Sequence, residues 1–254
     1  KRRADGLAPR WRSRRGKTVP LDKPDPRYTT SKRAQQNFRL ALRLSLAFIG
    51  VLWTVFIFDE AFGLGLTRFG LRPGSVTGLI GLVTAPLLHA NFPHILSNTL
   101  PLLISSTAML YLYPNAALRV VPAIWLGSGL LAWLIGRSSV HVGASGLIYG
   151  LLAYVFISGI LRRDMRSIAV SLLVGFLYGS MVWGVLPIRP HMSWEMHLGG
   201  ALVGGLLAFL YRNWDRVPVL RYDWEDDDRV PDWAEELRPQ WVAMALIYWC
   251  LALP

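Results

Sequence analysis

The sequence predicts an all-α membrane protein, a polytopic bundle of six transmembrane helices. Hydrophobic residues make up 53% of the 254 residues, above the roughly 45–50% of a typical soluble domain, and the mean hydropathy is +0.35. The apolar residues gather in blocks between positions 40 and 211, as membrane spans do. The net charge of +11 is concentrated at one end, because residues 1–43 hold 14 Lys or Arg and three Asp.

The N-terminal tail, residues 1–38, is basic and contains four prolines, a composition typical of disorder. A basic segment can bind nucleic acid, or it can hold the N-terminus in the cytosol when an apolar span follows. Because an apolar span follows directly, we expect a cytosolic tail that contacts anionic lipid headgroups and binds no nucleic acid. The tail does not resemble a cleaved signal peptide, since its charged part is too long and no small-residue cleavage site follows.

Six apolar stretches define the predicted membrane domain, residues 39–211. Each is close to the ~20 residues with which a helix crosses a bilayer. A glycine-rich connection follows the first stretch and contains an apolar part, 76–88, that we expect to be a partly embedded loop rather than a span. Such a loop is tolerated where surrounding protein satisfies its backbone. The predicted spans are 40–58, 94–113, 118–135, 145–161, 168–186 and 196–211.

The short loops predict the orientation of the bundle. With the N-terminus inside, the loop that carries Arg162, Arg163 and Arg166 also falls inside, as the positive-inside rule requires. The opposite loops carry fewer, scattered basic residues. We therefore expect a multi-pass protein of a bacterial plasma membrane with a cytoplasmic N-terminus.

Residues 212–254 form a charged C-terminal tail with a final apolar segment at 241–253. At about 13 residues this segment is short for a span, so it could lie at the membrane interface or begin a seventh span. The single cysteine, Cys250, excludes an intramolecular disulfide and a cysteine-based zinc site.

Polar side chains inside the predicted spans mark candidate functional residues, because burying them in lipid is costly. Ser145 opens the fourth span, His197 lies at the start of the sixth, and Asn98 lies in the second. At about 1.5 Å per residue, all three lie roughly 22–25 Å from the cytosolic ends of their spans. His94 shares a helical face with Asn98, and Tyr149 shares one with Ser145, since each pair is four residues apart.

A hydroxyl, an imidazole and an amide at one depth are the minimum set of groups for acyl transfer. Ser145 needs a base to become a good nucleophile, and His197 can take its proton. The developing oxyanion needs fixed donors, which His94, Asn98 and the Ser145 backbone N–H could supply.

Glycines four residues apart follow both candidate catalytic residues. Gly146 and Gly150 lie on the serine span, and Gly200 and Gly204 lie on the histidine span. Small residues at this spacing let two membrane helices approach closely, which a hydrogen bond between Ser and His requires.

Three motifs, taken together, resemble the rhomboid family of intramembrane serine proteases. GASG at residues 143–146 is similar to the family's G-x-S-G at the start of its fourth span. HILSN at 94–98 is similar to H-x-x-x-N in the second span, with His89 ahead of it, and HLGG at 197–200 is similar to H-x-x-G in the sixth. The resemblance covers about residues 40–211, and its strength lies in finding all three motifs in order.

The resemblance implies a Ser–His dyad without a third acid, in a water-filled cavity open to the outside. Ser145 would be the nucleophile and His197 the general base and acid, while His94, Asn98 and the Ser145 N–H would form the oxyanion site. The resemblance also implies single-span membrane proteins as substrates, and neither a metal nor another cofactor. The implied supporting residues are Tyr149, Gly143, Gly146, Gly200 and His89.

Two further features bear on the resemblance. Residues 184–194 resemble the family's flexible cap over the active site. Met196 stands where a small residue often precedes the histidine, and it could crowd the helix interface.

Other functions fit parts of the sequence. A catalytically silent rhomboid-like protein would bind client transmembrane helices without cutting them, but it would be expected to lack the nucleophile or the base. A transporter would place ionisable residues near the midplane and often shows internal repeats, whereas this polar layer is off-centre and no repeat is evident. His89, His94 and His197 could suggest a metal, but no carboxylate shares their layer. We expect His141 and His191 to be loop histidines.

Overall fold

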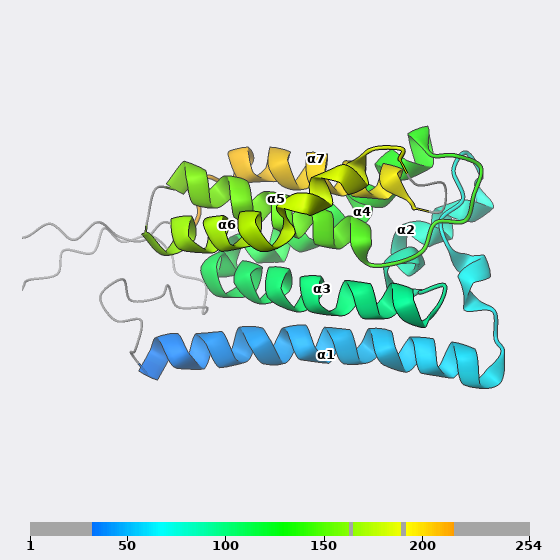
Figure 1. Ribbon diagram of the computed structural model, residues 1–254, viewed down its shortest axis with the longest axis horizontal. Helices are drawn as coiled ribbons and strands as arrows, with labels where there is room; N and C mark the ends of the chain where they lie inside the picture. The colour runs from blue at the N-terminus through cyan, green and yellow to red at the C-terminus, as the bar shows by residue number, and fades with distance from the viewer. Residues whose placement is uncertain (1–31, 163–164, 189–191, 216–254) are drawn as a thin grey trace, which may run out of the picture. The chain divides into compact units, whose positions relative to one another are not determined.

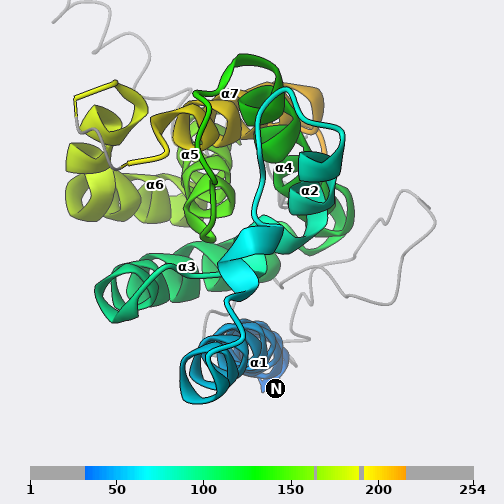
Figure 2. The ribbon, with the colours of Figure 1, turned by 90° about the vertical axis from the view of Figure 1, so that its right-hand side faces the viewer.

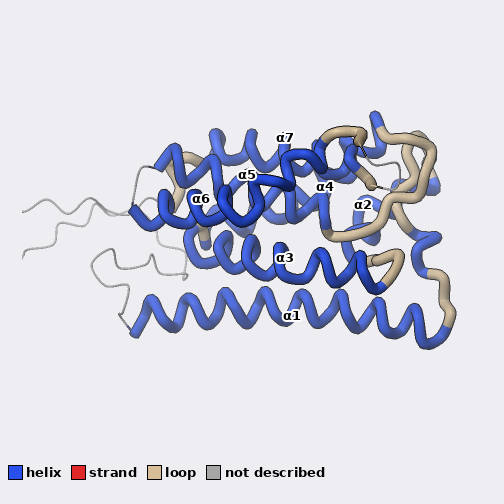
Figure 3. The backbone as a smooth tube through the Cα atoms, in the orientation of Figure 1, coloured by secondary structure: helices blue, strands red, loops and turns tan. Residues whose placement is uncertain are grey.

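The computed structural model of the protein describes residues 32–162, 165–188 and 192–215. Within these residues the structure is a bundle of helices, and the only strand-like pairing is an isolated bridge between Leu71 and His141. Helices run roughly side by side in Figure 1, and the longer loops gather at one end in Figure 3. The predicted N-terminal tail up to residue 31 and the apolar segment at 241–253 lie outside the described residues.

The first helix, α1 (Lys32–Phe62), has 31 residues and extends the predicted span 40–58 at both ends. It continues toward the N-terminus because residues 32–39 contain no helix breaker. It ends where Gly63 and Gly65 adopt positive φ angles of 58° and 62°, a conformation that glycine takes readily. Asp59 then stabilises the turn, since its Oδ1 accepts a hydrogen bond from the Leu66 N–H at 2.9 Å.

The connection after α1 is an ordered loop of four short helical pieces, and its apolar part, Thr77–Leu87, is shorter than a membrane span needs. Two tryptophans of α4 bind its backbone: Trp125 Nε1 donates to the Val83 carbonyl at 3.2 Å, and Trp133 Nε1 donates to the Ser75 carbonyl at 2.9 Å. The loop backbone is thus partly satisfied by protein, as a backbone at membrane depth requires. The four pieces are η1 (Leu66–Phe69), η2 (Thr77–Ile80), α2 (Gly81–Thr84) and η3 (Ala85–Leu87).

The remaining helices correspond to the other five predicted spans. Together with α1, five candidates in the described part of the chain are long and apolar enough to cross a bilayer, and α7 is an apolar helix of 17 residues, close to the length a span needs. The six-helix membrane bundle expected from the sequence is therefore confirmed. The helices after the loop are α3 (Phe92–Leu112), α4 (Pro114–Ile135), α5 (Ser145–Arg162), α6 (Met165–Tyr178) with its extension η4 (Gly179–Val185), and α7 (Trp194–Leu210).

Helix α5 lies at the centre of the bundle. It packs against α7, α6, α3 and α4, whereas α1 packs mainly on α3; Figure 2 shows α1 on the far side of α3 from the other helices. Most of α5 is buried in protein, while α6 exposes large apolar side chains such as Leu172 and Phe176. A central helix shielded from lipid can carry polar side chains at a low desolvation cost.

Candidate active site

Ser145 is the first residue of α5, and a tightly held loop delivers it there. Gly143 has a φ of 111°, which side chains rarely allow, and a Cβ at this position would come within 2.6 Å of His94 Nε2. The Gly143 N–H donates to the Ala85 carbonyl at 2.8 Å. The glycine thus lets the chain turn into α5 directly against the His94 ring.

His197, in the first turns of α7, contacts Ser145 directly. Its Nε2 lies 2.8 Å from Ser145 Oγ, and its Nδ1 lies 2.9 Å from the carbonyl oxygen of Gly184. A carbonyl can only accept, so Nδ1 carries the proton that is donated to Gly184. In the neutral ring this leaves Nε2 as the acceptor for the Ser145 hydroxyl, which is the arrangement that a general base needs.

The ring of His197 is held in place by Tyr149 of α5. The two rings stack with centroids 4.2 Å apart and planes 7° from parallel. The Tyr149 hydroxyl donates to the Met181 carbonyl at 2.9 Å, so η4 fixes the tyrosine while it also orients the histidine. A Cβ on Gly184 would overlap the Tyr149 hydroxyl, so this position accommodates only glycine without rearrangement.

The close approach of α5 and α7 follows from their glycines. A Cβ on Gly200 would overlap the main-chain oxygen of Gly146, and a Cβ on Gly204 would overlap that of Gly150. The two backbones are therefore in direct contact, as the spacing of small residues predicted. This contact brings Ser145 and His197 within hydrogen-bonding distance.

Asn98, from α3, brings an amide to the loop before Ser145. Its Nδ2 would lie 3.6 Å from a Cβ on Gly143, and this buried nitrogen has no hydrogen-bond partner among the described residues. Buried polar groups are nearly always paired. An unpaired donor near Gly143, two residues before Ser145, is therefore well placed to bind an acceptor that arrives with a substrate.

His89 packs behind His94, in the connection before α3. The two rings meet edge to face with centroids 5.2 Å apart, and His89 is only 3% exposed. Burial lowers the pKa of His89 to about 4, so its ring is neutral at physiological pH. The structure thus places His89 as a packing support for His94, away from the Ser145–His197 contact.

The structure changes two expectations about single residues. Met196 does not crowd the contact between α5 and α7, because its side chain packs with Leu71 and Ala132 on another side of α7. His141 does lie in a loop, but it is wholly buried; His191 lies outside the described residues. Within the described ranges, no three His, Cys, Asp or Glu side chains lie together as a metal site.

The carbonyl of Gly184 is the site feature that the sequence did not predict. Residues 184–194 are expected to resemble a cap over the active site, and the sequence assigns none of them to the His197 ring. A main-chain acceptor leaves no side-chain signal, and its role depends on how η4 folds over Tyr149.

Comparisons with known proteins identify the family of the chain. The family model described as Rhomboid domain matches residues 76–214. An uncharacterized protein of Mycobacterium bovis is 35% identical over 81% of this chain and 90% of its own length, and one of Mycobacterium leprae is 33% identical over 65% of this chain and 69% of its own. RHOMBOID-like protein 1 of Arabidopsis thaliana is 28% identical over 51% of this chain and 34% of its own. The chain belongs to the rhomboid family.

Proposed function

We propose that this protein is an intramembrane serine endopeptidase that cleaves single-span membrane proteins near the outer face of the membrane. The observation that carries the proposal is the contact of 2.8 Å between Ser145 Oγ and His197 Nε2, with Nδ1 bound to a carbonyl. A serine, a histidine oriented to act as its base and an unpaired amide donor lie within one buried layer. A catalytic site accounts for all three together, whereas separate structural roles would require a coincidence.

The reaction would proceed by acyl transfer. His197 Nε2 takes the Ser145 proton as Oγ attacks the scissile carbonyl carbon, and the carbonyl oxygen becomes an oxyanion. Asn98 Nδ2, His94 and the Ser145 N–H are the expected donors to that oxyanion; the first N–H groups of a helix such as α5 have no intrahelical partner. The protonated His197 then gives its proton to the leaving nitrogen, and water hydrolyses the acyl-enzyme through the same residues.

A carbonyl in place of a third acid changes how the base is oriented. In a Ser–His–Asp triad the acid holds the imidazole tautomer. Here the Gly184 carbonyl and the Tyr149 ring would share that task, without placing another charge inside the bundle. Substrate class, cytoplasmic N-terminus, bacterial plasma membrane and lipid contacts of the basic tail belong to the same proposal.

The test is cleavage of a single-span substrate by the detergent-purified protein, beside its Ser145→Ala variant. We expect the parent to cleave and the variant, which lacks only one oxygen, to remain folded but inactive. Mass spectrometry of both products would locate the cut bond. Equal cleavage by the two proteins would show that Ser145 is not the nucleophile. No cleavage of any of several substrates by a folded parent would instead favour a client-binding protein.

A further inference from the structure

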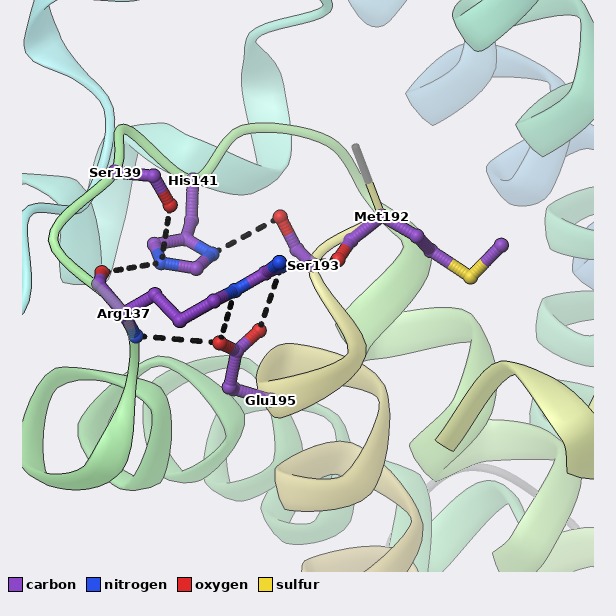
Figure 4. A network of polar contacts seen from close by, with 6 residues as sticks. All are labelled: Arg137, Ser139, His141, Met192, Ser193 and Glu195. Atoms are coloured by element: carbon purple, nitrogen blue, oxygen red, sulfur yellow. Dashed lines mark hydrogen bonds and ion pairs between the residues drawn. The ribbon is translucent and has the colours of Figure 1, made fainter. Parts of the chain in front are cut away.

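A polar network joins the loop before Ser145 to the first turn of α7, outside the site described above. Glu195 Oε1 accepts from Arg137 Nε at 2.7 Å and from the Arg137 backbone N–H at 3.2 Å, and Oε2 lies 3.4 Å from Arg137 Nη2. The same Nη2 donates to the Met192 carbonyl at 2.5 Å. Figure 4 shows the guanidinium lying beside the carboxylate at the start of α7.

The ion pair is asymmetric in its burial. The Glu195 side chain is 0% exposed, whereas that of Arg137 is 41% exposed. A buried carboxylate is tolerated only when it is paired and hydrogen-bonded, so the position of the first turn of α7 depends on where Arg137 lies. The α7 N-terminus also favours a negative charge at this point.

A second link, between His141 and Ser193, runs beside the first. His141 Nδ1 lies 3.0 Å from Ser193 Oγ, while Nε2 lies 3.2 Å from Ser139 Oγ and 3.3 Å from the Arg137 carbonyl. Ser193 occupies the N-cap of α7, yet its side chain makes no hydrogen bond to the helix it precedes. The hydroxyl serves a link between segments instead of the usual cap.

The two segments joined by this network are the ones that carry the dyad. Ser145 lies four residues after His141, and His197 lies two residues after Glu195. At 100° per residue, Glu195 and His197 project from roughly opposite sides of α7. The network therefore holds the helix from one side while His197 meets Ser145 on the other.

We propose that the Arg137–Glu195 and His141–Ser193 links form a positioning clasp that sets the register of His197 against Ser145. The inference rests on the proposed protease function and assigns Arg137, Glu195, His141 and Ser193 as positioning residues, since none touches the reacting atoms. A misplacement of about 1 Å in an active site can lower the rate roughly 100-fold. Loss of the clasp should therefore lower kcat far more than it changes KM.

The decisive variant replaces both charges at once, Arg137→Met with Glu195→Leu. The carboxylate of this pair is buried, and exchanging a buried ion pair for apolar residues of similar size is often neutral for stability. We therefore expect the fold to be kept while the Arg137–Glu195 link of the clasp is lost. We expect the melting temperature to stay close to that of the parent. We expect kcat for a single-span substrate to fall roughly 10- to 100-fold with KM within about 2-fold, and labelling of Ser145 by a fluorophosphonate to slow equally.

A milder pair of variants covers the case in which the double variant does not fold. Ser193→Ala removes the hydroxyl that meets His141, and Ser193→Thr restores one. We expect kcat to fall roughly 3- to 10-fold in Ser193→Ala, in line with the loss of one hydrogen bond, and to recover in Ser193→Thr. A matched control is Asp215→Ala, which breaks a polar link at the opposite end of the bundle and should leave kcat unchanged.

The outcomes separate the clasp from the protease itself. A parent that labels and cleaves, with a folded double variant or a Ser193→Ala variant that does so at the same rate, would overturn the clasp and leave the protease intact. A folded parent that neither labels nor cleaves would overturn both. A general folding defect would lower kcat and the melting temperature together. A variant in which kcat falls only together with the melting temperature would therefore also count against the clasp.

Discussion

Single residues near Ser145 keep hydrogen-bonding capacity that the folded protein does not use. The Asn98 amide is buried, and its nitrogen has no partner among the described residues. Leaving such a donor unpaired costs about 1–3 kcal/mol. The proposed oxyanion role would explain why this destabilising feature stands beside the loop that leads to Ser145, since the donor would gain its partner only when a substrate reacts.

Asn98→Ala is expected to lower kcat roughly 100-fold, as the loss of one oxyanion donor does, with a smaller change in KM. The measurement is steady-state cleavage of a single-span substrate by the purified variant. Its control is Ser106→Ala, which removes a hydroxyl bonded to the Leu102 carbonyl of the same helix and should cleave at the rate of the parent. An unaltered rate in Asn98→Ala would remove Asn98 from the oxyanion site.

The sequence predicts side chains at this scale better than main-chain contacts. Ser145, His197 and Asn98 can be recognised in the sequence because polar side chains are costly to bury within a membrane span. The Gly184 carbonyl is not recognisable, because every residue has one. In the sequence, Arg137 is one of the scattered basic residues of the loops. Its partner Glu195 is 58 positions away, and the sequence alone does not reveal which distant charges meet.

At the scale of helices, the pairing of α5 with α7 determines whether the dyad can form. Their backbones touch at glycines, so no side chain separates them. In lipid, where apolar side chains gain little by leaving the solvent, such close packing is a main source of helix association. The same contact therefore supports the fold and brings Ser145 and His197 together.

Gly204→Ala is expected to destabilise the bundle, because its Cβ would overlap the main-chain oxygen of Gly150, which cannot swing away as a side chain can. Overpacking of this kind costs about 1–3 kcal/mol. Thermal unfolding in detergent would report it as a lower melting temperature. Gly50→Ala, on α1, is the matched control, since a Cβ there meets nothing within 4 Å; it should melt no lower than the parent. Equal melting of the two variants would contradict the tight contact.

Helix existence was predicted more accurately than helix limits. Hydropathy marks where lipid begins and ends, so it identified 40–58 within α1 but not the polar turns that extend this helix to Lys32–Phe62. Likewise, 168–186 was predicted as one span, whereas the structure has α6 followed by the 3-10 turns of η4. Those turns carry the carbonyls of Met181 and Gly184 to Tyr149 and His197.

Across the whole molecule, the two ends of the bundle hold different polar contacts. One end holds the Ser145–His197 contact and the links proposed as the clasp. The other, roughly 25 Å away along α5, holds Arg162, which donates to the Leu112 carbonyl at 3.3 Å and lies 4.7 Å over the Tyr113 ring. There Asp215, after α7, accepts from the backbone N–H groups of Asn115 at 3.2 Å and Ala116 at 2.9 Å. The last described residues thereby cap α4, a contact across about 100 positions that no local pattern predicts.

Asp215→Ala is expected to lower the stability of the folded protein without lowering kcat. Removing a side chain that caps the first N–H groups of a helix costs about 0.5–2 kcal/mol, and the carboxylate also favours the positive end of the α4 dipole. The melting temperature should fall, while kcat of the folded fraction should equal that of the parent, because His197 lies roughly 20 Å up α7 from this end. Asp215→Asn retains one acceptor oxygen and should melt between the two. A loss of kcat in Asp215→Ala at a temperature where the variant is fully folded would mean that the two ends of the bundle are coupled, and that the dyad is not positioned by its neighbouring contacts alone.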